Sequence, residues 1–273
     1  MIFTKTIFML KQNSNIKDRI AENEQPFDFK IQFYLEKGFE ICNQFAVGFI
    51  GFYFLFLLIT GTVGNFGSLG EVLNRIFITP ILAVGPYFVA RQIYQNQPFN
   101  FDQFWLGVKN FYPLAIVAAI QTGVFLFFLS PMFFSEKGKL INQWFREWQE
   151  DPMAMTNFPE FPTIYLLLLI PIVYLAVAWA YAPLFVIFKD LNPLDALETS
   201  HKMVTRKWLI VFGFFIILGI IIFSGILFFG IGILYTLPIS ACMLYVSWVD
   251  WMEHHEGATP EEQDWMKDLM DAF

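Results

Sequence analysis

Four long windows of this chain contain no charged residue. Asp, Glu, Lys and Arg are absent from residues 41–70, 110–135, 161–188 and 208–249. A helix of about 20 apolar residues spans the roughly 30 Å of hydrocarbon in a bilayer. The first three windows therefore predict one crossing each. The fourth predicts two crossings, joined by a tight reversal near the glycines at 230–232.

A sixth crossing is expected between Arg75 and Arg91, because both side chains can reach the interfaces while their stems stay in hydrocarbon. Its uncharged centre is shorter than those of the other five. The pattern thus predicts an all-α, polytopic transmembrane helical bundle with six crossings, at about 40–60, 73–94, 111–133, 163–188, 208–229 and 232–251.

The crossings divide the chain into an N-terminal segment with an interfacial helix at 1–38, a transmembrane domain at 39–252 and an acidic tail at 253–273. Thirteen of the 17 Lys and Arg residues lie on the side of the termini, and four lie on the other side with the loop 134–162. Cytoplasmic loops carry an excess of Lys and Arg. We therefore expect a multi-pass protein of the cell membrane, with both termini cytoplasmic and the loop 134–162 exported.

The composition supports this interpretation. Hydrophobic residues make up 56% of the chain and charged residues only 15%, whereas soluble domains average about 25% charged residues. This argues against a disordered chain, a disulfide-rich secreted domain and an ordinary soluble enzyme. The net charge of −7 and the lack of a Lys and Arg cluster argue against nucleic-acid binding. Cys42 and Cys242 lie in apolar stretches, which favours buried small side chains over a disulfide.

Short amphipathic segments are expected between the crossings. Three segments each place a set of mainly apolar residues at the spacing of one helix face. The sets are Phe101, Phe104, Trp105 and Val108; Leu194, Leu197, His201 and Val204; and Leu140, Ile141, Trp144, Phe145 and Trp148. Asn192 and Pro193 are typical of the N-cap and the first residue of a helix. Such helices either lie flat among the lipid headgroups or are connectors packed on protein.

Similar residue patterns recur along the chain and predict a threefold repeat. The first two copies begin with Phe27-Asp28-Phe29 and Phe99-Asn100-Phe101, which lead at the same spacing to Lys37-Gly38-Phe39 and Lys109-Asn110-Phe111, and Arg206-Lys207-Trp208 marks the third. In the return crossings, Pro86-Tyr87-Phe88-Val89 resembles Pro183-Leu184-Phe185-Val186. The unit would be a short helix followed by a two-crossing hairpin. The alternative is that a basic residue before an aromatic one simply marks where a helix enters a membrane.

The segments 192–200 and 206–209 carry a family resemblance. They are similar to a recurrent segment of uncharacterised bacterial multi-pass membrane proteins, which are related to the membrane domain of some glycerophosphodiester phosphodiesterases. With the crossing pattern, the likeness covers roughly residues 27–251. It implies a six-helix fold in a bacterial inner membrane and no agreed activity, and the chain has no room for the phosphodiesterase catalytic domain.

No constellation of catalytic residues is found in the sequence. A nucleophile elbow, a P-loop and a dinucleotide fingerprint are all missing. The adjacent His254 and His255 point in different directions on a helix, and His201 is the only other histidine. The sequence therefore predicts no catalytic residue, no metal site and no cofactor, and we expect that the protein is not an enzyme.

The crossings contain prolines, whose freed backbone groups need partners inside the membrane. The polar residues able to supply them, or to line a cavity, are Gln121, Thr122, Ser224, Thr236 and Ser240. They are the candidate cavity or helix-contact residues.

The acidic tail carries the other candidate surface. Residues 259–262 form a capping box that opens a short helix with an apolar side made of Trp265, Met266, Leu269, Met270 and Phe273. Its many acids would be repelled by an anionic inner leaflet, which favours docking on a protein partner.

Two functions are consistent with the sequence. The first is a non-enzymatic scaffold or accessory subunit of a membrane assembly, surrounded by membrane lipids and joined to a protein partner through the tail. The alternative is a carrier or flippase for lipid-like molecules. A cavity open to lipid with Gln121 or Ser240 in its wall would favour the carrier. The sequence leaves the oligomeric state open.

Overall fold

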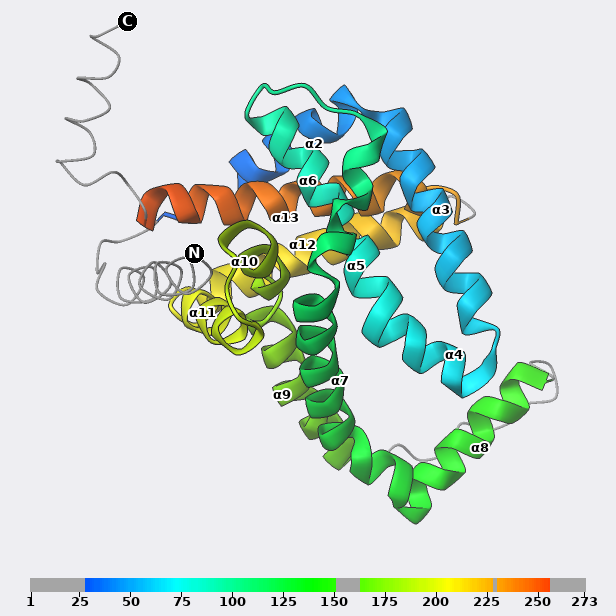
Figure 1. The fold of residues 1–273 in the computed structure, drawn as a ribbon. Coiled ribbons are helices and arrows are strands. Elements are labelled where there is room, and N and C mark those ends of the chain that lie inside the picture. Colours follow the sequence, from blue (N-terminus) through cyan, green and yellow to red (C-terminus); the bar gives the residue numbers. More distant parts are fainter. Residues whose placement is uncertain (1–27, 151–162, 228–229, 256–273) are drawn as a thin grey trace, which may run out of the picture.

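A computed structural model describes residues 28–150, 163–227 and 230–255 of the chain, and these form helices joined by short connections (Figure 1). Six helical stretches are long and apolar enough to cross a membrane, namely Ala46–Gly64, Leu69–Tyr94, Phe101–Pro131, Tyr165–Lys189, Trp208–Leu227 and Ile233–Glu253. The predicted all-α bundle with six crossings is confirmed. The protein is therefore a multi-pass integral membrane protein.

The described helices fall into three consecutive units, each with a short helix, an outgoing crossing and a return crossing. The first unit contains α2 (Ile31–Gln44), α3 (Ala46–Gly64) and a return made of α4 (Gly67–Leu73), the π-helix η1 (Asn74–Ile78), α5 (Thr79–Ala83) and α6 (Gly85–Tyr94). The second contains the 3₁₀-helix η2 (Phe101–Asn110), α7 (Phe111–Phe134), the connecting helix α8 (Glu136–Glu150), α9 (Thr163–Ala178) and α10 (Ala182–Lys189). The third contains α11 (Pro193–Thr205), α12 (Trp208–Leu227) and α13 (Ile233–His255).

Contacts between the units follow a cyclic order. Each short helix packs on the return crossing of the unit before it, so that η2 contacts α6, α11 contacts α10, and α2 contacts α13. The outgoing crossings do the same, with α7 against η1 and α5, α12 against α9, and α3 against α13. Because the first unit closes on the last, the three units form a ring. The predicted helix-plus-hairpin repeat is thus present in the arrangement of the helices.

Two return crossings are interrupted at equivalent places. The helix breaks at Val84, between α5 and α6, and again at residues 179–181, between α9 and α10. In each case a proline, Pro86 or Pro183, follows the break in the first turn of the next helix. Proline has no backbone N–H and is tolerated there, whereas it disrupts a helix interior. The third return, α13, continues through Pro238.

Small residues bring the short helices close to their neighbours. A Cβ atom on Gly38 of α2 would lie 2.6 Å from the Cα of Met243 in α13, and one on Gly107 of η2 would lie 2.3 Å from the carbonyl oxygen of Ile81 in α5. On α11 the buried Ser200 donates a hydrogen bond of 2.7 Å to the carbonyl of Ala178. These short helices therefore pack on protein along one side, as close helix contacts in membranes generally require small residues.

A polar contact also joins α2 to α13. The Tyr34 hydroxyl donates a 2.6 Å hydrogen bond to the Asp250 carboxylate, and the Lys30 ammonium lies 3.5 Å from the same group. Burial of the ring and the hydrogen bond to Asp250 raise the pKa of Tyr34, so its hydroxyl keeps its proton. The circle of three helical units is thus closed at the α2–α13 contact by close packing, a hydrogen bond and an ion pair.

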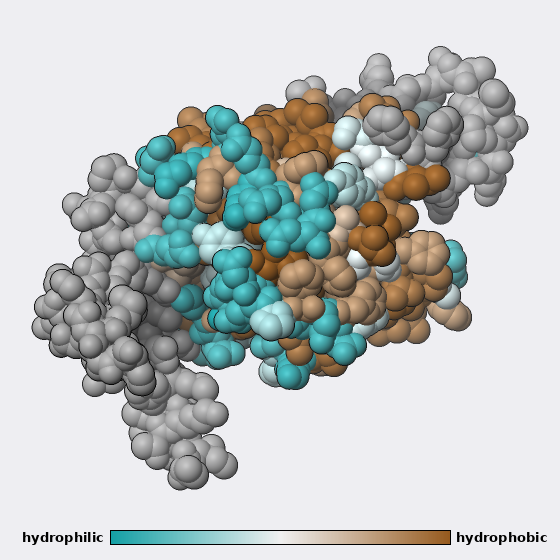
Figure 2. Space-filling view, turned by 90° about the horizontal axis from the view of Figure 1, so that it is seen from above, coloured by the Kyte–Doolittle hydropathy of each residue, from teal (hydrophilic) through white to brown (hydrophobic). Residues whose placement is uncertain are grey.

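The outer surface is mostly apolar. Among the exposed large side chains are Phe54, Leu166 and Leu209 on three different crossings. Figure 2 shows hydrophilic side chains gathered in one broad patch and hydrophobic side chains over much of the remaining face. This distribution is typical of a protein with water at its ends and lipid at its sides.

Some boundaries and faces differ from the sequence predictions. The first crossing begins at Ala46 instead of about residue 40, because the backbone bends at Phe45 and residues 40–44 complete α2, which thus extends beyond the segment 1–38. The connector η2 has its buried residues, Phe104 and Gly107, three positions apart, and it forms a 3₁₀-helix with three residues per turn. Four of the described residues of the predicted apolar faces are exposed, namely Trp105, Val108, Leu140 and Leu194.

Glycines with positive φ occur at two reversals. Gly230, before α13, lies in the reversal expected near residues 230–232 and has φ of 76°, and Gly67, at the start of α4, has φ of 72°. This left-handed region is readily available only to glycine. The predicted amphipathic helix in the loop 134–162 is α8, which leaves the far end of α7 and extends toward the side of α4 (Figure 1).

We expect Gly38→Ala to destabilise the protein by about 1–3 kcal/mol, because the added methyl group would overlap the α13 backbone. Gly213→Ala is the matched control, since its Cβ meets nothing within 4 Å. Heating in detergent with a thiol-reactive dye measures the effect, because Cys42 and Cys242 are buried in the folded protein. Equal melting temperatures for the two variants would contradict the α2–α13 contact.

Candidate functional site

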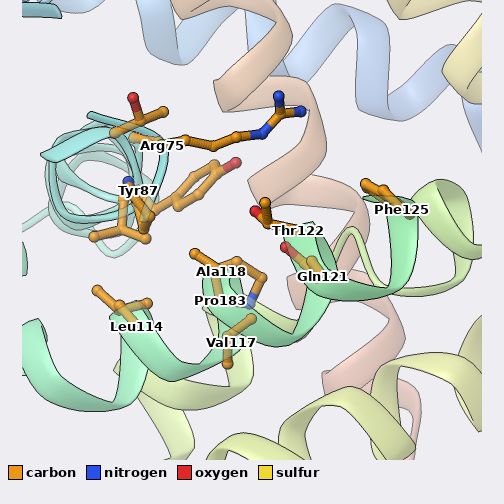
Figure 3. Close-up of a pocket in the computed structure, with 13 residues that line it drawn as sticks. Arg75, Tyr87, Leu114, Val117, Ala118, Gln121, Thr122, Phe125 and Pro183 are labelled. Carbon is orange, nitrogen blue, oxygen red and sulfur yellow. The ribbon is translucent and has the colours of Figure 1, made fainter. Parts of the chain in front are cut away.

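A cavity of about 250 Å³ lies between the first two units and is open on one side (Figure 3). One wall comes from η1, α5 and the start of α6, and the other comes from α7. The polar lining residues are Arg75, Thr79, Tyr87, Gln121 and Thr122. Apolar lining is supplied by side chains that include Leu114, Val117, Ala118, Phe125 and Pro183. The cavity therefore combines a polar set of groups with a hydrocarbon wall.

The π-helix η1 positions Arg75. Its first residue, Asn74, donates a 2.9 Å hydrogen bond to the carbonyl of Thr60 on α3 and accepts one of 3.2 Å from Thr79. A π-turn holds an extra residue and is frequently found at functional sites. In Figure 3 the Arg75 side chain extends from this helix above the ring of Tyr87, while Leu114 and Val117 of α7 lie on the opposite side of the cavity.

Arg75 is a charged residue within a crossing. It lies six positions inside the stretch Leu69–Tyr94, and no described side chain forms an ion pair with it. Ionisable residues within membrane helices usually face the bundle interior or a cavity and serve a function. Arg75 lies near the start of its crossing, is exposed and also lines the cavity.

The α7 wall also holds one of the interrupted helices together. The Gln121 amide donates a 3.3 Å hydrogen bond to the carbonyl of Trp179, which lies in the break between α9 and α10. The next residue, Thr122, has its hydroxyl on the cavity side in Figure 3. Two of the five candidate polar residues thus share one site, and both breaks border it through Val84 and Pro183.

The other three candidates lie elsewhere and bond within their own helices. The hydroxyls of Ser224, Thr236 and Ser240 donate to carbonyl oxygens three or four residues earlier, at 2.6, 3.2 and 2.9 Å. Thr236 also packs where α13 crosses α12, since a Cβ on Gly225 would lie 2.3 Å from its hydroxyl oxygen. Thr236 is therefore a contact within the α12–α13 hairpin, whereas the hydroxyl bonds of Ser224 and Ser240 stay within their own helices. The predicted docking residues Trp265, Met266, Leu269, Met270 and Phe273 lie outside the described residues.

A second hollow occupies the equivalent junction between the second and third units. It measures about 500 Å³ and is almost entirely apolar, with Ile170 and Tyr174 of α9 facing Trp208 and Phe212 of α12. At Tyr174 the hydroxyl lies 3.1 Å from the His201 Nε2. This hollow has no charged lining residue, so only the first cavity presents a charge.

Sequence reasoning missed Arg75, Thr79 and Tyr87 as site residues. It placed Arg75 at an interface, because an arginine near the end of a crossing usually reaches water. The signal that could have found the site is the polar pair Asn74 and Arg75 inside an otherwise apolar run. No group of His, Cys, Asp or Glu suited to a metal ion occurs among the described residues.

No family model matches the chain, and no curated protein or solved structure gives a significant match. The resemblance to the membrane domain of glycerophosphodiester phosphodiesterases therefore stays a sequence-based expectation. The class of protein rests on the six apolar helices alone.

We expect Gln121→Leu to lower the stability by about 0.6 kcal/mol and by no more than about 1.7 kcal/mol, the mean and the maximum measured for hydrogen bonds between membrane helices. The variant removes the donor to the Trp179 carbonyl and keeps a side chain of similar size. Ser224→Ala is the control, because its hydroxyl bonds only within α12. Thermal unfolding of both variants in one detergent tests this, and a Gln121→Leu melting temperature equal to the wild type would refute the interhelical bond.

Proposed function

We propose that this integral membrane protein binds and carries an amphiphilic, lipid-like molecule in the cavity between η1, α5 and α7. The single observation that carries the proposal is a cavity whose polar groups, Arg75, Gln121 and Thr122, face an apolar wall within membrane-spanning helices. A carrier with Gln121 in its cavity wall is one of the two functions that the sequence allows.

The size of the cavity favours the headgroup as the enclosed part of the ligand. About 250 Å³ is less than the roughly 300–1,000 Å³ of pockets that enclose a drug-sized molecule. Because the cavity is open on one side and the neighbouring surface is apolar, a hydrocarbon chain can lie outside it along the helices. A headgroup in the cavity and a chain against the protein surface suit an amphiphile.

The interrupted helices support carriage in addition to binding. Discontinuous helices form substrate sites in many transporters, where one repeat or bundle rocks against the other around the fixed site. Here Val84, at the first break, and Pro183, two residues after the second, both line the cavity. A shift at either break would change the width of the cavity directly.

The scaffold hypothesis depends on the tail residues 259–273, which lie outside the described residues. Deleting these residues separates the two functions. A scaffold would lose its co-purifying proteins, whereas a carrier would keep its lipid.

The test is to fill the cavity. Ala118 is buried on the α7 wall, and Ala118→Trp would place an indole in the space for the headgroup. Gly123→Trp is the matched control, because it lies on the same helix and its Cβ meets nothing within 4 Å. We expect native mass spectrometry to show a retained lipid on the wild type and on Gly123→Trp, and loss of at least about 90% of it on Ala118→Trp, as expected for overpacking of a closely fitted site.

Equal lipid retention in both variants would overturn the proposal, as would a wild-type protein that retains no lipid. Ala118→Leu guards against a folding defect, since it fills less of the cavity. Its lipid occupancy is expected to be intermediate, with a melting temperature near that of the wild type.

A further inference from the structure

We infer that the headgroup bound in this cavity is an oxyanion, a phosphate or a carboxylate, and that Arg75 is the residue that selects it. This inference rests on the proposed function and adds the chemical class of the ligand. The observation behind it is the charge of the lining. Arg75 is the single charged residue among those that line the cavity, and all other polar lining groups are neutral.

The local carboxylates do not neutralise Arg75. Glu71 lies one turn earlier on the same helical run, yet it is exposed and forms no ion pair with Arg75 among the described contacts. The side chain of Arg75 runs above the ring of Tyr87 at the edge of the cavity that it lines (Figure 3). Arg75 is itself exposed, so its guanidinium is accessible to a ligand that enters the cavity. A charge-assisted hydrogen bond from an anionic headgroup to this guanidinium would add to its binding.

The neutral groups around Arg75 suit the same ligand. A guanidinium presents a planar fork of N–H donors that matches phosphate and carboxylate oxygens. The amide of Gln121 uses one hydrogen for the Trp179 carbonyl and has a second to donate. The hydroxyls of Tyr87 and Thr122 flank the same space in Figure 3. Donors therefore converge from both walls, and the described lining holds no carboxylate that would repel an anion.

The position of Arg75 also indicates which leaflet supplies the ligand. Arg75 lies near the start of the return crossing, close to the turn at Gly67 and away from the end at Tyr94. An even number of crossings separates Tyr94 from each of the described ends of the chain, Asp28 and His255. These two ends therefore lie on the same side of the membrane as Tyr94. The headgroup would thus enter from the leaflet opposite to these ends.

The experiment measures binding of short-chain lipids to the full-length protein in a neutral detergent. The probes are dioctanoyl phosphatidic acid, decanoate and dioctanoyl phosphatidylcholine, and inorganic phosphate is added as a competitor. We expect the wild type to bind both anionic amphiphiles about tenfold more tightly than phosphatidylcholine, in line with a hydrogen-bonded charge pair.

Three variants locate the effect. Arg75→Gln should lose about tenfold in affinity for both anions and leave phosphatidylcholine unchanged, while Arg75→Lys should keep part of the preference because it keeps the charge without the fork. Glu71→Gln is the matched control, since it removes a neighbouring charge outside the cavity, and it should not weaken anion binding.

The outcomes separate the two proposals. Anion binding by Arg75→Gln at the wild-type level would overturn the inference, and so would equal wild-type affinity for phosphatidylcholine and phosphatidic acid. In both cases loss of lipid from Ala118→Trp would still support the carrier. Competition by inorganic phosphate at the affinity of the lipids would show a site for the free anion and overturn the lipid headgroup. Failure of the wild type to bind any probe would overturn both proposals.

Discussion

The hydrocarbon core of a bilayer offers no hydrogen-bond partners, so the freed carbonyl and N–H groups of a broken helix need partners within the protein or in ordered water. The break between α9 and α10 shows how this is done. Ser200 of α11 bonds the carbonyl of Ala178, and Gln121 of α7 bonds the next one, at Trp179. One break is thus held from two sides. These two hydrogen bonds connect the break to α7 of the second unit and to α11, the short helix of the third unit.

Close helix contacts convert three similar units into a closed ring. Gly38 and Gly107 let α2 and η2 approach the return crossings at backbone distance, where a larger side chain would force them apart. The junctions between units are not equally filled, however. The junction of α7 with η1 and α5 leaves a polar cavity, and that of α12 with α9 leaves an apolar hollow. One junction is thus lined by a charged residue, Arg75, and the lining of the other contains none.

The candidate site was only partly predictable. Gln121 and Thr122 stand out in the sequence because polar side chains in an uncharged window need a partner. Arg75 lies next to Asn74 in an otherwise apolar run, but the sequence gives no sign that the π-helix η1 brings it to a cavity opposite α7. Ser224, Thr236 and Ser240 have the same composition signal as Gln121, yet they bond within their own helices. The sequence cannot tell a lining residue from a helix contact.

The sequence by itself determined that six helices cross the membrane, where they turn, and that a short helix precedes each hairpin. It could do so because the cost of charge in hydrocarbon and the conformational freedom of glycine act locally. Only the tertiary structure decided the closure of α2 on α13, the 3₁₀ form of η2 and the cavity around Arg75. These features depend on which side chains from distant segments meet, and a pattern along one helix contains no record of its neighbours.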